Sequence, residues 1–266
     1  SLVETEIPTN TNLLVLASPQ TELLPGEMDK LLAYVAAGGN LLWLTEPDTP
    51  NSLQPLAEQL GVDVLPGTVV DATTQMFGIE NPTFVVITGY PRHGISRDMT
   101  TVTVFPEAAA VETNDSAAWN VVSLLTTLEH SWTELGDIEG TVSFDSDSDE
   151  RAGPLDIGVV LTRTPGEASE DTESTASEQR IVVIGDGDFL SNTYLGNPGN
   201  LDLGLNIVRW LSHDDATIEI RVMSAPDTSL VLGKTAQALI AIGFLVGLPL
   251  LLLLAGLVIW LRRRRR

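Results

Sequence analysis

The stretch NLLVLASPQTELLPGEMDKLLAYVAAGGNLLWLT, residues 12–45, decides the fold class of this chain. Its two ends, 12–18 and 40–45, are short apolar runs typical of buried strands. Between them, apolar residues recur at helical spacing: Met28, Leu31, Leu32 and Val35. The glycine pair at 38–39 then suits the end of a helix. The stretch therefore predicts a strand, a helix and a second strand.

The same alternation continues along the chain. We expect a helix at 52–60, two extended pieces within 61–71, and a helix at 201–212. Further runs predict strands at 83–88, 101–105, 155–162, 180–184 and 217–223, whereas 117–129 fits either a strand or a helix. Strands that alternate with helices indicate an α/β fold with a mostly parallel sheet, covered on both faces by helices.

The C-terminal region has a different character. Residues 236–261, AQALIAIGFLVGLPLLLLLAGLVIWL, carry no charge, and five arginines follow at 262–266. A run of this length exceeds the roughly 20 residues that cross a bilayer. Basic flanks stay on the cytoplasmic side. We therefore expect one transmembrane helix in the cytoplasmic membrane, a basic cytoplasmic tail, and the rest of the chain on the extracytoplasmic (periplasmic) side.

This organisation divides the chain into an extracytoplasmic α/β domain at 1–223, a linker at 224–235, and the membrane helix with its tail. Because the sequence opens at Ser1 without a targeting segment, we expect the domain to be truncated at its N-terminus. Within the membrane helix, Gly243 and Gly247 have the GxxxG spacing that lets another helix approach closely. We therefore expect the membrane helix to pack against a partner helix through these two glycines.

Charge and cysteine content exclude several classes of protein. The chain has 14 Lys and Arg, six of which are Lys234 and the terminal arginines, so residues 1–233 hold 8 against 36 Asp and Glu, a formal charge of −28. Such a domain repels nucleic acid, whose binding needs cationic side chains. The absence of cysteine excludes disulfides, thiolate metal sites and a cysteine nucleophile.

The segment RIVVIGDGDFLSN, residues 180–192, places Gly-Asp-Gly-Asp after a predicted strand. Leu190 stands where a dinucleotide fingerprint needs its third glycine, and two aspartates repel a phosphate, so a phosphate cradle is excluded. Two interpretations remain. The segment is a structural turn with capping side chains, or it contacts a ligand, partner or cation through Asp186, Gly187, Asp188 and Asn192. We expect Phe189 to enter the core and assign no metal site.

Catalytic signatures are weak elsewhere. No Gly-x-Ser-x-Gly elbow occurs, and the three histidines have no metal-ligand spacing. His93, Ser96 and Asp98 share one short loop, which indicates a polar turn because triad residues come from separate loops. The acidic runs at 145–150 and 163–179 read as solvated loops.

The order of these motifs resembles the gliding-motility-type (GldG-like) ABC-transporter auxiliary proteins. The matching segments are 12–47, 60–71, 93–112, 123–134 and 180–192, together with the C-terminal anchor and its arginines. The resemblance implies a flavodoxin-like domain, distantly similar to class I glutamine amidotransferases, and partners that are the permease and ATPase subunits of an ABC transporter. It also implies further α/β structure before Ser1.

The sequence therefore predicts a membrane-anchored, non-enzymatic auxiliary or ligand-binding component of an ABC-type transport system, of the gliding or export type, without a cofactor. The alternative is a membrane-tethered extracytoplasmic hydrolase that acts on glycans or peptides through paired carboxylates.

Overall fold

The computed structural model describes residues 2–47, 49–79, 81–114, 118–138, 142–164 and 178–214, and then positions 244, 249, 250, 253, 256, 257, 260, 263 and 264. The chain divides into two units, residues 1–217 and residues 218–266. The predicted strand at 217–223, the linker at 224–235, and both Gly243 and Gly247 lie outside the described residues.

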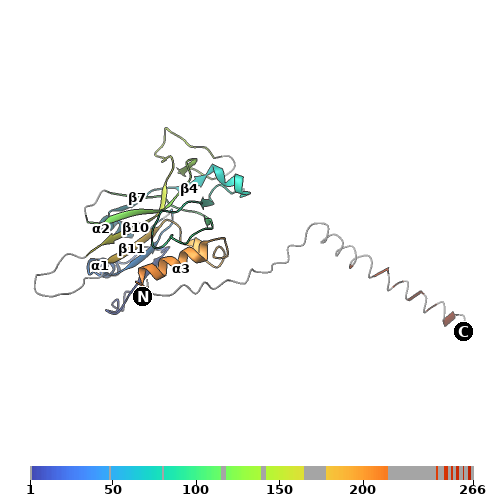
Figure 1. Ribbon diagram of the computed structural model, residues 1–266, viewed down its shortest axis with the longest axis horizontal. Helices are drawn as coiled ribbons and strands as arrows, with labels where there is room; N and C mark the ends of the chain where they lie inside the picture. The colour runs from blue at the N-terminus through green and yellow to red at the C-terminus, as the bar shows by residue number, and fades with distance from the viewer. Residues whose placement is uncertain are drawn as a thin grey trace, which may run out of the picture. The chain divides into compact units, whose positions relative to one another are not determined.

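A five-stranded sheet forms the centre of the first unit (Figure 1). Its strands, in spatial order, are β1 (Leu14–Ala17), β2 (Leu41–Leu44), β11 (Gln179–Ile184), β10 (Asp156–Arg163) and β8 (Asn120–Thr126). Strands β1, β2 and β11 pair in parallel, whereas β10 is antiparallel to both of its neighbours. The sheet is therefore mixed, with four strands running one way and β10 the other.

The expectation of a mainly parallel sheet is confirmed for β1, β2 and β11, and the reversed β10 makes the sheet mixed. A parallel connection needs a crossover, usually a helix. The sequence between Arg163 and Gln179 has no large hydrophobic residue with which a crossover helix would pack on the sheet. In order of appearance the five strands lie 1-2-5-4-3, which differs from the flavodoxin order 2-1-3-4-5.

Three helices cover the two faces of the sheet. Helices α1 (Pro25–Ala36) and α2 (Gln54–Leu60) pack on one face, and α3 (Asn200–Leu211) packs on the other (Figure 1). Alternate residues of β2 serve the two cores: Leu41 and Trp43 face α1 and α2, whereas Leu42 and Leu44 face α3. All four are buried, because both faces of a strand in this position exclude water.

Local sequence explains where the helices begin and end. Helix α1 starts with Pro25 at its first position, where a missing N–H costs nothing, and Glu27 accepts the N–H of Leu24 at 3.2 Å. Helix α2 ends at Gly61, whose φ of 68° is a left-handed conformation that glycine adopts without strain.

Smaller antiparallel ladders and short turns connect these layers. The ladders pair β3 (Val62–Val64) with β7 (Val111–Thr113), β4 (Thr68–Asp71) with β9 (Ser131–Glu134), and β5 (Val85–Ile87) with β6 (Thr103–Phe105). The 3₁₀ turns are η1 (Asn51–Leu53), η2 (Ala72–Phe77) and η3 (Asp188–Leu190). The ambiguous segment 117–129 contains the strand β8.

The second unit is described at separate positions only, and those from 249 to 264 are helical. The Arg264 guanidinium lies 5.2 Å from the centre of the Trp260 ring, one helical turn away. Within the part of the chain that the structure describes, no helix combines the length and the apolar character needed to cross a membrane.

Candidate functional site: an acidic edge of the sheet

The carboxyl ends of the three parallel strands meet at one edge of the sheet. Ala17, Leu44 and Ile184 are neighbours in the ladder, and each is the last residue of its strand. The Ser18 N–H donates to the Leu44 carbonyl at 2.9 Å, and the Thr45 N–H donates to the Ile184 carbonyl at 2.8 Å. The residues that follow these strands are therefore held together, at the place where α/β proteins most often bind ligands.

Glu46 is the centre of this edge. Its Oε1 atom accepts the Ser18 hydroxyl at 2.6 Å and the backbone N–H of Gly187 at 3.0 Å. The side chain is half-buried, and burial raises the pKa of Glu46 above its ordinary value. The two hydrogen bonds oppose that rise, whereas the negative charges of Asp188 and Glu107 add to it.

Asp186, directly after β11, is completely buried. Its Oδ1 atom accepts the Phe189 N–H at 3.2 Å, and its Oδ2 atom has no hydrogen-bond partner. Burial, and then the charges of Glu46 and Asp188, raise the pKa of Asp186 to about 8. At neutral pH, Asp186 is therefore a neutral carboxylic acid next to an ionisable one.

The two glycines of Gly-Asp-Gly-Asp permit this close packing. A Cβ atom on Gly187 would overlap the Ser18 hydroxyl oxygen, and a Cβ atom on Gly185 would overlap the Ala109 carbonyl oxygen. The Ala109 N–H also donates to the Gly185 carbonyl at 2.7 Å. Both positions need glycine because neighbouring chain comes so near. The predicted turn is thus present, with Phe189 buried in the core.

We call Glu46, Glu107, Asp186 and Asp188 the acidic edge. Of the residues singled out in the sequence, Asp186 and Gly187 lie in its interior, and Asp188 is exposed at the start of η3. Asn192 is exposed beyond η3, and no described contact joins it to Asp186. Among the described residues, no group of three His, Asp or Glu side chains is arranged to hold a metal ion.

Sequence reasoning missed Ser18 and Glu46. Ser18 ends the predicted strand at 12–18, Glu46 follows the one at 40–45, and both precede proline, so each resembled an ordinary strand end. The available signal was that parallel strands end at the same edge. Applied to 12–18, 40–45 and 180–184, that rule brings Ser18 and Glu46 to Asp186.

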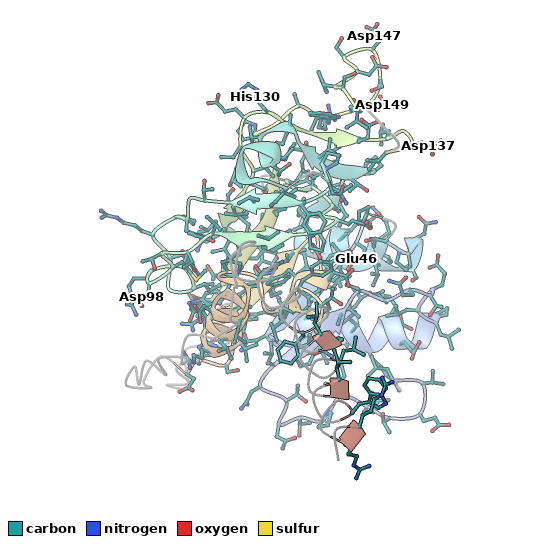
Figure 2. All side chains as sticks on the ribbon, turned by 90° about the vertical axis from the view of Figure 1, so that its right-hand side faces the viewer. Glu46, Asp98, His130, Asp137, Asp147 and Asp149 are labelled. Atoms are coloured by element: carbon teal, nitrogen blue, oxygen red, sulfur yellow. The ribbon has the colours of Figure 1, made fainter. Side chains whose placement is uncertain are left out.

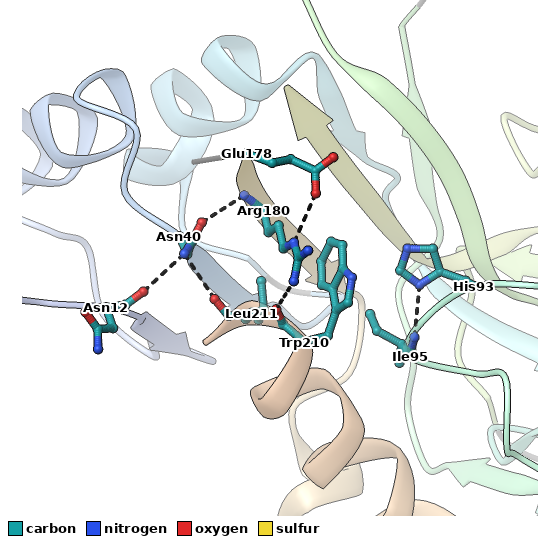
Figure 3. Close-up of polar contacts among 8 residues, drawn as sticks. All are labelled: Asn12, Asn40, His93, Ile95, Glu178, Arg180, Trp210 and Leu211. Carbon is teal, nitrogen blue, oxygen red and sulfur yellow. Dashed lines mark hydrogen bonds and ion pairs between the residues drawn. The ribbon is translucent and has the colours of Figure 1, made fainter. Parts of the chain in front are cut away.

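A pocket of about 320 Å³ lies at the opposite edge of the sheet, lined by Thr11, Asn12, Gly38, Gly39, Asn40, Glu178, Ser212 and His213. Its polar side chains have structural duties (Figure 3). Asn40 donates to the Leu211 carbonyl at 3.0 Å and to the Asn12 carbonyl at 3.2 Å, and it accepts the Arg180 N–H at 2.8 Å. One amide thus joins α3, the start of β1 and β11, which identifies this edge as a structural junction.

Arg180 completes the same junction. Its guanidinium donates to the Trp210 carbonyl at 2.7 Å, lies 4.8 Å from the Trp210 ring centre, and pairs with Glu178 at 3.1 Å (Figure 3). A cation at the C-terminal end of α3 is stabilised by the helix dipole. The negative charge of Glu178 is therefore paired with the positive charge of Arg180.

The loop that carries His93 is the polar turn predicted from the sequence. The Nδ1 atom of His93 accepts the Ile95 N–H at 3.2 Å, and the Ser96 hydroxyl donates to the Pro91 carbonyl at 2.6 Å. The His93 ring packs against Trp210 with a centre-to-centre distance of 4.9 Å (Figure 3). Burial, and then the charge of Arg180, lower the pKa of His93.

The acidic loop at 145–150 is likewise a solvated turn, and most of its hydrogen bonds are internal. Asp145 accepts the Asp147 N–H at 2.9 Å, and Glu150 accepts the Asp145 N–H at 2.8 Å. Figure 2 shows Asp147 and Asp149 on a projecting loop, well apart from Glu46. These carboxylates therefore do not contribute to the acidic edge.

Comparison with known proteins identifies the family of this chain. The family model described as "ABC-type uncharacterized transport system" matches residues 1–210, and the chain therefore belongs to that family. A search of the curated proteins finds no match.

Solved structures resemble the chain in fold. The mmIFT52 N-terminal domain has a TM-score of 0.54 at 18% identity, with 78% of this chain and 80% of that chain covered. A putative ThuA-like protein from Bacteroides uniformis has a TM-score of 0.39 at 17% identity, with 75% and 69% covered. A cytoplasmic protein from Salmonella typhimurium has a TM-score of 0.43 at 12% identity, with 75% and 71% covered. At 18% identity, the likeness to the mmIFT52 N-terminal domain concerns the α/β fold alone.

Proposed function

We propose that this member of the ABC-type transport system family is a non-enzymatic accessory subunit of a gliding- or export-type transporter. In this proposal, residues 236–261 anchor the chain in the cytoplasmic membrane, and the α/β domain lies on the extracytoplasmic side. The acidic edge is the surface through which the domain contacts the permease of the transporter or its cargo. Family membership over residues 1–210 supports the association with a transport system.

The main support for this contact surface is that Asp186 is buried with one carboxyl oxygen unpartnered. A buried polar atom without a partner costs roughly 1–3 kcal/mol, and a fold tolerates few of them. The unpartnered Oδ2 atom of Asp186 lies at the carboxyl edge of parallel strands, beside the half-buried Glu46. Groups kept in an unfavourable electrostatic setting cluster at functional sites. The acidic edge is therefore the better candidate than the pocket at Asn40.

One contact at the acidic edge favours the hydrolase alternative. The Ser18 hydroxyl donates to Glu46, a carboxylate whose pKa is raised, and this pair has the composition of a nucleophile with its base. However, one backbone donor of this edge, the Gly187 N–H, is already bound to Glu46. An acyl-transfer site needs such donors for the developing oxyanion. A binding role fits the arrangement better than hydrolysis.

Co-purification tests the accessory role. Full-length tagged chain, extracted from its native membranes in a mild detergent, is expected to retain an ABC ATPase and a multi-span permease. The double variant Glu46→Gln/Asp188→Asn is expected to lose most of both. Asp147→Asn/Asp149→Asn removes the same charge from the projecting loop and is expected to retain them. Recovery of neither subunit by any of these chains would overturn the proposal.

Membrane attachment has its own test. Alkaline carbonate releases proteins held by surface contacts, whereas spanning helices stay in the bilayer. The full chain is expected to remain in the membrane pellet, and a chain ending at residue 233 is expected in the supernatant. Protection of the 262–266 arginines from trypsin added outside intact cells would support the proposed orientation, and their cleavage would reverse it.

A further inference from the structure

The acidic edge brings carboxyl groups together. The charges that raise the pKa of Glu46 are those of Asp188 and Glu107, and the charges that raise the pKa of Asp186 are those of Glu46 and Asp188. Several basic side chains of the described domain contact other groups: Lys30 contacts Glu6, Arg97 contacts Asp98, Arg151 contacts Glu112, Arg163 contacts Trp119, and Arg180 contacts Glu178 and Trp210. Negative charge is therefore concentrated at this edge.

A second, independent observation points to a missing ligand. The Oδ2 atom of Asp186 is buried and unpartnered, although its sister atom binds the Phe189 N–H. The two neighbouring residues are closely packed, Gly187 against Ser18 and Gly185 against Ala109. The fold thus holds an acid in a fixed place next to a carboxylate that solvent reaches.

Two classes of ligand are incompatible with this geometry. Phosphates and other anions are repelled by the acidic edge. A resident metal ion needs several oxygen ligands within about 2.6 Å, and the described carboxylates are not grouped that closely. A protonated nitrogen group is less demanding, because its donors point in several directions and reach carboxylates that are too far apart to share a metal.

We propose that the acidic edge binds a protonated amine or guanidinium group, held by Glu46, Asp188 and Glu107 with Asp186 behind them. This inference rests on the proposed function, because it names the chemistry that the contact surface recognises. The nitrogen belongs either to a small cationic molecule or to a lysine or arginine side chain of a partner protein. In both cases the contacts are charge-assisted hydrogen bonds, which are stronger than neutral ones.

Proton release is the signature of this site. A cation next to Asp186 favours the ionised form and so lowers a pKa that now lies at about 8. Binding at pH 7 therefore expels a proton, whereas cations that merely collect around an acidic protein leave Asp186 protonated. Calorimetric titration in two buffers of different ionisation enthalpy measures that proton directly.

The experiment uses the full chain in detergent micelles at about 0.15 M salt, where attraction over more than about 8 Å is screened. The probes are agmatine and spermidine in one arm, and an arginine-containing peptide in the other. Citrulline and the same peptide with glutamine are the neutral controls. We expect saturable binding in at least one arm, no binding of the neutral controls, and release of a proton at pH 7. Binding in the first arm identifies a small-molecule source, and binding in the second alone identifies a protein side chain.

Variants locate the site. Glu46→Gln/Asp188→Asn is expected to weaken binding about tenfold or more, which corresponds to roughly 1.4 kcal/mol. Asp147→Asn/Asp149→Asn loses the same charge and is expected to bind like the parent chain. Asp186→Asn is expected to bind without releasing a proton. If the first variant fails to fold, Glu107→Gln/Asp188→Asn changes exposed residues only, and a loss of about threefold is expected.

Absence of binding in both arms would overturn the inference, and so would an equal loss in the two charge-matched variants. These results are separable from the test of the accessory role. Co-purification with the transporter without amine binding leaves the proposed function intact, and amine binding without co-purification leaves the inference intact.

Discussion

The Oε1 atom of Glu46 lies 3.0 Å from the backbone nitrogen of Gly187, although 141 positions separate the two residues in the chain. This hydrogen bond joins the residues that follow β2 and β11, the two central parallel strands. The same oxygen accepts the Ser18 hydroxyl, so the ends of all three parallel strands converge on one atom. The stability and the chemistry of the acidic edge are therefore linked, and both can be tested.

Asp186 makes the free energy of unfolding depend on pH. Its pKa is about 8 in the folded chain, against an ordinary value of 3.8 that applies when the chain unfolds. Between these values the folded state holds a proton that the unfolded state has lost, so the stabilising contribution is complete below about pH 4 and disappears as the pH rises to about 8. The expected slope is up to about 1.4 kcal/mol per pH unit.

Asp186→Asn isolates this contribution. Asparagine keeps an oxygen for the Phe189 N–H and cannot ionise. Chemical denaturation from pH 4 to pH 9 should show that the variant gains stability over the parent chain as the pH rises, with the largest gain above pH 8. A difference that does not change with pH would contradict a buried neutral acid.

Gly187→Ala should destabilise the domain by about 1–3 kcal/mol, the usual effect of overpacking. The added methyl group would overlap the Ser18 hydroxyl oxygen, whereas the next nearest atoms lie at 3.2 Å and 3.3 Å. Ser18→Ala removes the overlapping atom, so the double variant should regain most of the loss. Gly26→Ala, which meets no atom within 4 Å and lies in the first turn of α1, is the control and should not destabilise the domain. Thermal unfolding distinguishes these cases, and a double variant as unstable as Gly187→Ala would exclude the overlap as the cause.

Gly185→Ala should be more damaging and resistant to rescue. The obstructing atom is the carbonyl oxygen of Ala109, which belongs to the backbone and cannot be removed by substitution. The strain would also break the hydrogen bond from the Ala109 N–H to the Gly185 carbonyl. We expect a loss of about 3 kcal/mol or poor soluble yield. A stable variant with unchanged unfolding would show that the 109 loop moves freely.

Asn40→Ala tests the junction at the opposite edge. The substitution leaves the Leu211 and Asn12 carbonyls and the Arg180 N–H without their common partner, so we expect a loss of about 2–3 kcal/mol. Asn206→Ala removes a single amide–carbonyl bond, to Ile95, and should cost about 1 kcal/mol. Hydrogen exchange at the C-terminal turn of α3 should accelerate in the first variant only. Equal effects would contradict the role of Asn40 as a three-way link.

Local patterns were sufficient for most elements of the domain. The apolar runs at 12–18 and 40–45 and the helical spacing from Met28 to Val35 predicted β1, β2 and α1. Burial on both faces explains the run in β2, whereas the expected burial was wrong for β1, an edge strand in which Val15 is exposed. Pairing direction was less accessible. The reversal of β10 is not encoded in residues 155–162 themselves, and it agrees with the segment between Arg163 and Gln179, which has no large hydrophobic residue for a crossover helix.

The candidate site was predicted in part for a related reason. The Gly-Asp-Gly-Asp motif predicted Asp186 and Gly187 as candidate residues, but their partners Ser18 and Glu46 are distant in sequence. Asn192 belonged to the same motif and lies elsewhere, because η3 turns the chain after Asp188. Proximity along the chain was a poor guide, and the shared end of parallel strands was the better one. The strand at 217–223 and the membrane segment stay predictions.

The central place of β11 also determines when the sheet can be completed during synthesis of the chain. Strand β2 pairs on one edge with β1, which lies close to it in the sequence, and on its other edge with residues 181–184, which are synthesised much later. Until then an apolar strand edge stays open, and open edges promote association between chains. A polypeptide interrupted before Gln179 would keep that edge exposed. The acidic edge therefore forms only when β11 has joined the sheet, so a chain that can bind there has already paired its parallel strands.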